Sequence, residues 1–462
     1  MGIALRVIYW GSCGALLLAG SALAIRAEEP SDLIWEAGVA KAEITPPAGL
    51  WMAGYGGRTL AAEGTSQPLY VRALALRDRA GHYAIVVATD TLGLTREISA
   101  EIYNELWERH QLPPACIMLN ASHTHCGPVL RQALYDIYPL DEHQHRLIDH
   151  YSAWFTTRIL ETIEKAITHM QPVTVYSGYG MCQFAVNRRT NPESDVPRRR
   201  ELRELIGPQD HSVPVLSIRG QDGSWLACVF AYACHNTVLS FNRWHGDYAG
   251  CAQLWLEQHN PGMTALFVMG CGGDQNPIPR RSTELAEAYG EQLGKAVAEV
   301  LGSHMKPVIS QLQTERSEVL LPYEELPSRE RLLALASRED YAARWARRML
   351  LLSEQDEPVP QAYPYPLSVW KLGSGLTWIS LGGEVVVDYG LKFKGLYGWD
   401  TWVTAYAHDV MAYIPTVRII REGGYEGQSS MMVYGLPSER WQEDIEEILT
   451  QEVDRLLKRL QQ

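Results

Sequence analysis

The chain has 462 residues, of which 46% are apolar and 21% are charged, and this composition is that of a globular protein with a large core. The formal net charge is −13, and the one arginine cluster, at 198–200, is short. An acidic chain without a basic face argues against nucleic acid as a partner, and its charge favours solubility.

The first 24 residues predict a cleaved signal peptide. A positive charge at Arg6 precedes a run of apolar and small residues over 7–24, which ends in the Ala-Leu-Ala pattern of a cleavage site. The run is also about long enough for a membrane anchor, but its small residues and its ending favour cleavage. We therefore expect a secreted or periplasmic protein.

The first part of the mature chain alternates between strand and helix patterns. A helix with a threonine cap is predicted over 95–110. Strands are predicted around it at 35–45, 69–77, 83–90 and 116–119. Strand–helix–strand order is typical of a sheet covered by helices and mostly parallel, and ligands in such sheets bind beyond the carboxyl ends of strands.

The rest of the chain continues the α/β pattern, apart from an acidic, proline-rich segment over 354–366 that predicts a loop. Helices are predicted at 141–170, 282–303, 328–355 and 438–460. Further strands are predicted at 173–177, 213–219, 225–233, 264–269 and 377–381. The sequence therefore predicts one α/β domain over 33–460, with a mostly parallel or mixed central sheet flanked by helices.

Several predicted strands end in side chains that suit a metal ion. Residues 119–128 read Leu-Asn-Ala-Ser-His-Thr-His-Cys-Gly-Pro, and in an extended chain His123 and His125 point to the same side. Four strand ends carry such groups: His123 with His125, His235, Asp274 and Glu384. Two or three imidazoles with one carboxylate suit a catalytic zinc, whereas two imidazoles with one carboxylate also suit iron. Each group taken alone can equally be structural.

The ordered motifs of the chain resemble those of the neutral/alkaline non-lysosomal ceramidases, zinc amidases that cleave N-acyl-sphingosine into a fatty acid and sphingosine. The resemblance runs from about residue 36 to residue 437. It is carried by Gly-Val-Ala-Lys-Ala-Glu-Ile-Thr-Pro at 38–46, Asn-Ala-Ser-His-Thr-His-Cys-Gly-Pro at 120–128, Val-Asn-Arg at 186–188, Tyr-Ala-Cys-His at 232–235, Gly-Asp at 273–274, Gly-Gly-Glu at 382–384, Ala-Tyr-Ile-Pro-Thr at 412–416 and Gly-Tyr-Glu at 424–426.

The resemblance implies one zinc ion per chain. Its ligands would be His123, His235, Glu384 and the phenolic oxygen of Tyr413. The residues alone do not single out Tyr413 among the 23 tyrosines of the chain, where a half-buried aromatic is the ordinary interpretation. The resemblance also implies that the metal site lies at the carboxyl ends of strands in an α/β fold.

The same resemblance implies roles for three further residues. His125 would transfer a proton from water to the leaving amine, Tyr425 would stabilise the oxyanion, and Arg188 would lie on the substrate side. Arg188 can equally be a surface arginine in a basic loop. We expect Asp247 and Asp274 to orient the histidines, although an aspartate that holds a turn is the alternative.

The chain departs from the family at two motifs. Asn276 stands where the family has a serine, and Asn236 stands where it has a proline. The chain also ends in a predicted helix where ceramidases carry an immunoglobulin-like domain, so we expect that domain to be absent.

The sequence thus predicts a secreted zinc-dependent amidohydrolase that acts on ceramide or a related N-acyl lipid. Transient contact of the protein with a membrane surface is compatible with this prediction. The alternatives are a zinc amidase or esterase with a more polar substrate, and a metal-containing binding protein without catalysis.

Overall fold

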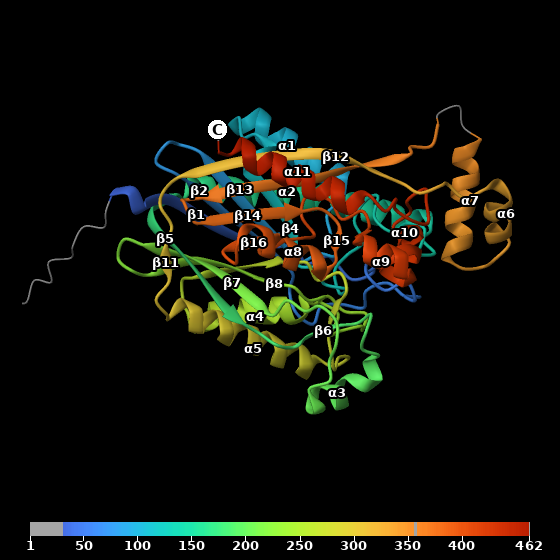
Figure 1. Cartoon of the computed structure of the whole chain (residues 1–462), viewed down its shortest axis with the longest axis horizontal. Coiled ribbons are helices and arrows are strands. Elements are labelled where there is room, and N and C mark those ends of the chain that lie inside the picture. The colour runs from blue at the N-terminus through green and yellow to red at the C-terminus, as the bar shows by residue number, and fades with distance from the viewer. Residues whose placement is uncertain (1–30, 355–357, 462) are drawn as a thin grey trace, which may run out of the picture.

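The computed structural model describes residues 31–354 and 358–461 (Figure 1). The signal peptide predicted over 1–24 lies outside this part of the chain. Among the helices of the described ranges, none has both the length and the apolar character needed to cross a bilayer.

A mixed sheet forms the centre of the molecule and has nine strands within the described residues. They are β1 (Ile34–Glu43), β2 (Tyr70–Arg77), β3 (Tyr83–Thr89), β4 (Ile117–Ala121), β5 (Gln171–Met181), β7 (Ser212–Gly220), β8 (Trp225–Tyr232), β9 (Thr264–Met269) and β11 (Lys306–Pro307). Their order is β4-β3-β2-β1-β5-β7-β8-β9, and β11 pairs with β5. The pairs β3–β4 and β8–β9 are parallel, whereas the other neighbours run antiparallel.

Of the two predicted kinds of sheet, mostly parallel or mixed, the mixed sheet is therefore confirmed, because its antiparallel strand pairs outnumber the parallel ones. A parallel pair needs a crossover connection. The two crossovers here contain α1 (Arg96–His110), between β3 and β4, and α4 (Asp247–His259), between β8 and β9. Histidines predicted for the metal site follow β4 and β8, the second strand of one parallel pair and the first strand of the other.

Helices cover one face of this sheet, and a second sheet covers the other. The helices α2 (Glu142–Thr168), α4 and α5 (Thr283–Leu301) pack on the first face. Alternate apolar residues on the other face pack against the second sheet. That sheet contains β12 (Leu312–Pro322), β13 (Ala362–Leu372), β14 (Leu376–Leu381) and β16 (Thr401–Thr404).

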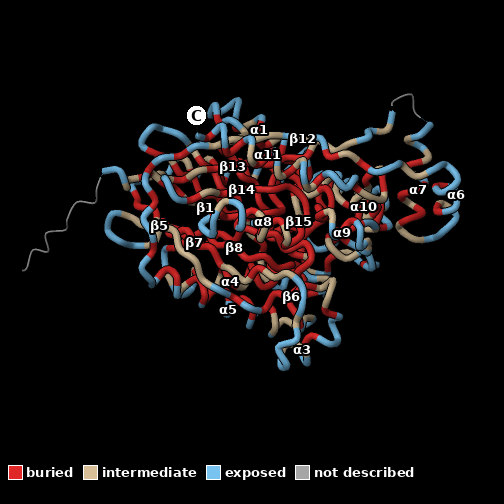
Figure 2. The backbone as a smooth tube through the Cα atoms, in the orientation of Figure 1, coloured by how far each residue is buried: buried red, intermediate tan, exposed pale blue. Residues whose placement is uncertain are grey.

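The outer face of the second sheet is covered by α8 (Val387–Tyr397) and α11 (Ile445–Arg459), which gives an α/β/β/α order of layers. Figure 2 shows the buried chain concentrated between these layers. The predicted central sheet flanked by helices is confirmed, whereas the second sheet was not predicted.

Three predicted boundaries are also wrong. The helix predicted over 328–355 is two helices, α6 (Arg329–Ala336) and α7 (Tyr341–Ser353), because the carboxylate of Asp340 caps a new helix start. The last helix begins only at Ile445. The predicted loop over 354–366 overlaps the start of β13. The prolines at 364 and 366 have a partner strand only on the β12 side, because pairing with β14 begins at Leu367. Their missing N–H groups therefore remove no hydrogen bond to β14.

The remaining short elements lie around the site. They are β6 (Ala185–Asn187), α3 (Val196–Leu202), β10 (Gln275–Pro277), β15 (Glu384–Val385), β17 (Tyr413–Ile414), α9 (Val417–Glu422), a π-helix turn (Tyr425–Ser429) and α10 (Ser430–Val433). β6 pairs with β10, and β15 pairs with β17 in parallel. These two small sheets bring distant parts of the chain to the ends of β4 and β8.

Candidate metal centre

The two histidines of the His-Thr-His motif lie just beyond the end of β4. His123 has a φ of 62°, so the chain is not extended there, and the predicted reason for the convergence of the two rings is wrong. The rings nevertheless meet, with 3.2 Å between their Nε2 atoms. Gly54 makes room for them, because a Cβ built on it would lie 2.5 Å from the His125 ring.

The other predicted ligands converge on the same point. The Oε2 atom of Glu384 lies 3.2 Å from His123 Nε2 and 2.9 Å from His235 Nε2. Glu384 and Tyr413 are partners in the parallel register of β15 and β17, and the Tyr413 hydroxyl lies 3.2 Å from His235 Nε2. All four predicted ligands are therefore close together, and each is buried.

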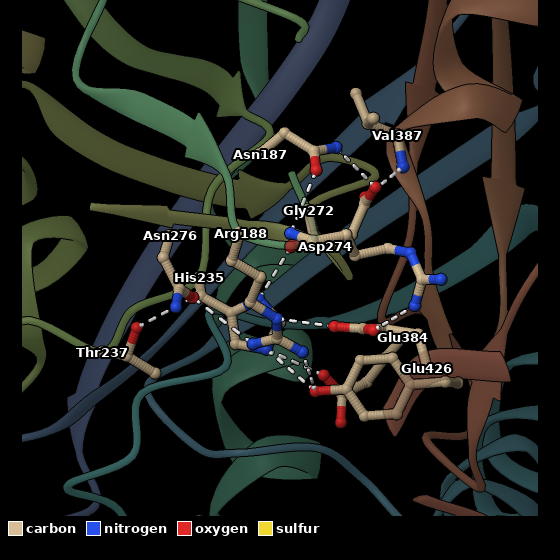
Figure 3. A network of polar contacts seen from close by, with 12 residues as sticks. Asn187, Arg188, His235, Thr237, Gly272, Asp274, Asn276, Glu384, Val387 and Glu426 are labelled. Atoms are coloured by element: carbon tan, nitrogen blue, oxygen red, sulfur yellow. Dashed lines mark hydrogen bonds and ion pairs between the residues drawn. The ribbon is translucent and has the colours of Figure 1, made fainter. Parts of the chain in front are cut away.

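Backbone carbonyls orient the two buried imidazoles. The Nδ1 atom of His123 is 2.6 Å from the oxygen of Leu92, and that of His235 is 2.7 Å from the oxygen of Gly272 (Figure 3). Each Nδ1 therefore donates a proton to a carbonyl, which leaves each Nε2 as an acceptor facing the centre.

The expectation that Asp247 and Asp274 orient the histidines is wrong. The Asp274 carboxylate accepts hydrogen bonds of 2.8 Å from Asn187 Nδ2 and from Val387 N (Figure 3). The Asp247 carboxylate accepts from backbone N–H groups at 238, 239 and 248. Both aspartates hold turns, which was the alternative interpretation, and burial raises the pKa of each to about 6.

Two tyrosines at the centre were missed from the sequence. The hydroxyl of Tyr434 donates a short hydrogen bond to Glu384 Oε1, and that of Tyr406 lies 3.4 Å from Glu384 Oε2. The Tyr406 ring also packs on His123, with 4.5 Å between centroids. Neither tyrosine lies in a patterned strand or helix, so the sequence carried no signal for them beyond the nearness of Tyr434 to the 424–426 motif.

Arg188 is half-buried and lies between the centre and a buried acid. Its Nη2 donates to the Tyr413 hydroxyl at 3.1 Å, and its Nε donates to Glu426 Oε1 at 2.7 Å (Figure 3). The Tyr425 ring lies next to Tyr413, with 5.3 Å between centroids, and it is 43% exposed. Tyr425 therefore stands at the open side of the centre.

Burial and mutual contact set the electrostatics of the centre. Burial, with a contribution from Arg188, lowers the pKa of His235 to about 4. Burial alone raises the pKa of Glu384, but contact with the imidazoles of His123 and His235 holds it well below its usual range. Burial also raises the pKa of Tyr413 well above its usual range, although Arg188 opposes this. Burial therefore favours the neutral form of His235, beside the carboxylate of Glu384.

The spacing of these atoms fits a tetrahedral metal ion. Ligand atoms about 2.0–2.1 Å from a tetrahedral zinc ion are about 3.3 Å apart. The distances from Glu384 Oε2 to the two Nε2 atoms, 3.2 and 2.9 Å, and from the Tyr413 hydroxyl to His235, 3.2 Å, are close to that value. The ring nitrogens of His123, His125 and His235 also lie within 4.8 Å of one another and could hold a metal ion.

The fold and the centre together define an α/β protein with a candidate metal site built from imidazoles, a carboxylate and phenols. A model of the family "Neutral/alkaline non-lysosomal ceramidase, N-terminal" matches residues 35–277, which is more than half of the chain. The chain belongs to the neutral/alkaline non-lysosomal ceramidase family, as the resemblance of its motifs implied.

Individual relatives are distant. Neutral ceramidase A of Dictyostelium discoideum is 26% identical over 235 residues, which are 46% of this chain and 31% of that protein. The match thus spans less than a third of the length of this curated relative.

Two solved structures share the fold. The neutral ceramidase from Pseudomonas aeruginosa aligns with a TM-score of 0.66 and 20% identity, over 87% of this chain and 72% of that one. A ceramidase complexed with C2 aligns with a TM-score of 0.67 and 18% identity, over 88% and 73%.

Proposed function

We propose that the protein is an exported zinc-dependent amidohydrolase that cleaves ceramide or a related N-acyl lipid. The observation that carries this proposal is the convergence of His123, His235, Glu384 and Tyr413 on one point, with spacings that suit zinc. When bound, a zinc ion there would activate water and polarise the amide carbonyl.

We assign the transfer of protons to His125. Imidazoles that bind a metal almost always donate their second N–H to a protein group, as His123 and His235 do. The Nδ1 of His125 is buried and has no hydrogen-bond partner within the described residues, so no protein group holds a proton on that nitrogen. This difference favours a ring that picks up and releases protons over a third nitrogen ligand. His125 would move a proton from the attacking water to the leaving amine.

Tyr425 and Arg188 would act on the oxygen of the amide. The partly exposed Tyr425 hydroxyl can donate to a carbonyl oxygen that becomes negative during the reaction. Arg188 donates to the Tyr413 hydroxyl, which favours the ionised phenol that a metal ligand needs. We therefore assign two roles to Arg188: it stabilises the ionised form of Tyr413, and it places a positive charge near the substrate.

Family membership supports the amide bond as the target and a lipid as the substrate. The similar proteins described above are named ceramidases, and one of the solved structures is a ceramidase complexed with C2. Export rests on the N-terminal sequence pattern alone.

Metal analysis of four variants, combined with mass spectrometry of amide cleavage, tests the proposal. We expect His123→Ala and Glu384→Ala to lose both zinc and activity. We expect His125→Ala and Tyr425→Phe to retain zinc while kcat falls, for His125→Ala by about 10²–10⁴-fold. Equal zinc content in His123→Ala and the unmodified protein would remove the ligand assignment. Zinc binding without cleavage of any amide would favour the binding-protein alternative.

A further inference from the structure

A cavity of about 470 Å³ adjoins the metal centre. Its lining includes Arg188, Arg189, Asn276, Arg280, Tyr425 and Glu426. Arg188 and Tyr425 both contact Tyr413, so the cavity begins beside the proposed metal ligand. Its size is within the usual range for small-molecule sites, and most of the side chains around it are charged or polar, with Ile278 as the aliphatic exception.

The charges of this wall are paired with one another. Glu426 accepts from both Arg188 and Arg189, and Arg189 also bonds Glu422. Arg280 is paired with Glu193, and both residues line the same cavity. Three guanidinium groups thus face three carboxylates, so the wall has no net charge to attract an ionic group.

An alkyl chain is also poorly matched to this wall. Such a chain would displace water from paired charges without replacing the hydrogen bonds of that water, which costs free energy. The partner that fits is an uncharged group with several hydrogen-bonding atoms.

Asn276 supplies free donors to this cavity. Its Oδ1 accepts from Arg188 Nη1 at 3.4 Å and from Thr237 Oγ1 at 3.5 Å (Figure 3). Because a guanidinium has only donors, the oxygen of the Asn276 amide must face Arg188. Its Nδ2 forms no hydrogen bond within the described part of the chain. The two N–H groups are therefore available to a ligand in the cavity.

The backbone of Asn276 is fixed as well. It pairs with Val186 in the β6–β10 sheet, and its side chain is only 4% exposed. A donor held on both sides loses little entropy when a ligand binds. Asn276 is also the residue at which the chain departs from the family motif.

We propose that this cavity is a subsite for an uncharged, hydroxyl-rich group of the substrate, with Asn276 as the donor that determines specificity. The inference rests on the proposed amide hydrolysis and narrows its substrate to single-chain N-acyl compounds with a polyhydroxylated group on one side of the amide. The long chain of sphingosine is the group that the cavity disfavours.

Three amides in identical detergent micelles test this preference. N-lauroylsphingosine has an alkyl chain on both sides, N-lauroylglucosamine carries its hydroxyl groups on the amine, and N-gluconoyl-dodecylamine carries them on the acyl group. The kcat/KM ratio of each polyhydroxylated amide to N-lauroylsphingosine is measured by mass spectrometry for the zinc-loaded protein. We expect one of the two ratios to be about ten or more, because a site built for hydroxyl groups rejects an analogue without them.

Two substitutions link that ratio to Asn276. Asn276→Asp keeps the oxygen that faces Arg188 and removes both donors, and Asn276→Leu removes all polar atoms. Each should bring the ratio close to one. Asn104→Asp, at an exposed position of α1, adds the same charge as Asn276→Asp and should leave the ratio unchanged. A ratio of one or less in the unmodified protein, or a ratio that survives both Asn276 substitutions, would overturn the subsite.

Binding to the metal-free protein separates this inference from the proposed function. Equilibrium dialysis compares the same amides where no cleavage is expected. Preferential binding of a polyhydroxylated amide, lost in Asn276→Asp, would support the subsite even if the zinc-loaded protein released no product from any amide. That combination would defeat the proposed hydrolysis alone. Equal binding of all three amides would overturn the subsite.

Discussion

At the scale of single residues, the hydroxyl of Tyr434 decides which oxygen of Glu384 is free. It donates to Oε1, so Oε2 is the atom that faces His123 and His235. A carboxylate held in this way presents one oxygen to a metal ion, and little conformational entropy is lost when the metal binds, because the side chain is already oriented.

We therefore expect Tyr434→Phe to weaken zinc binding by about 10–100-fold, as loss of a group that orients a ligand usually does. Competition with a chromogenic chelator measures this affinity. Tyr397→Phe is the matched control, because the Tyr397 hydroxyl donates to the carboxylate of Asp454. If both variants bind zinc as the unmodified protein does, Tyr434 does not position Glu384.

Gly54 shows how closely the backbone approaches the site. Its φ is +104°, and an added Cβ would lie 2.5 Å from the Cγ and Nδ1 atoms of His125. Gly81 has a similar φ of +92°, but an added Cβ there would meet nothing within 4 Å. Substitutions at Gly54 and Gly81 therefore share the backbone strain of a positive φ, but only a substitution at Gly54 displaces the imidazole.

We expect Gly54→Ala to lose about 1–3 kcal/mol more stability than Gly81→Ala, because only the first forces a side chain to move. Denaturant unfolding measures the difference. Gly54→Ala should also lower kcat, because His125 is displaced, whereas Gly81→Ala should keep it. If the two substitutions change stability and kcat by the same amounts, the His125 ring moves aside without loss of stability or activity, which would contradict this prediction.

At the scale of elements, the site depends on how strand ends are brought together. β4 and β9 lie at opposite ends of the strand order, yet Asn120 of β4 joins them. Its Oδ1 accepts from Met269 N at 2.8 Å, and its Nδ2 donates to the oxygen of Ala405 at 2.7 Å. The main sheet therefore curls until its two parallel pairs meet, and this places His123 beside His235.

Asn120→Ala should cost about 2–4 kcal/mol, because it leaves a buried N–H at 269 and a buried carbonyl at 405 unpaired. Urea unfolding measures this loss. Asn104→Ala, at an exposed helical position, should stay within about 0.5 kcal/mol of the unmodified protein. A loss as small as that of the control would mean that water replaces the Asn120 amide.

The predictable part of the site is the part that follows patterned strands. His123, His235 and Glu384 were singled out as candidates because each follows a buried apolar run. The same local pattern also singled out Asp274, and only the resemblance assigned the three residues as ligands. Tyr406 and Tyr434 lie in irregular segments placed by distant contacts, so no local pattern marks them. Tyr413 was reached through resemblance alone, since its strand β17 has only two residues and exists by pairing with β15.

At the scale of the whole molecule, the second sheet brings half of the centre to the main sheet. Trp370, Trp378 and Trp402 project from it into the layer between the sheets, with ring centroids 5.8 and 4.8 Å apart along the series. The sequence predicted only one strand of this sheet, at 377–381. The prolines at the start of β13 suggested a loop, and β12 and β16 were not recognised as strands. Glu384 and Tyr413 depend on this second layer for their position.

A metal ion bound at the centre would therefore hold the two layers together. His123 and His235 follow strands of the main sheet, whereas Glu384 and Tyr413 follow strand β14 of the second sheet in the chain. A ligand that binds only the folded state stabilises it, by about 2.7 kcal/mol when its free concentration is 100 times Kd.

Removal of zinc with a chelator should lower Tm by a few degrees, and added zinc should restore it, as followed by calorimetry. His123→Ala should start from the lower Tm and should not respond to the chelator. A Tm that is unchanged by chelation in the unmodified protein, or that falls equally in both proteins, would show that the four groups do not share a stabilising ion.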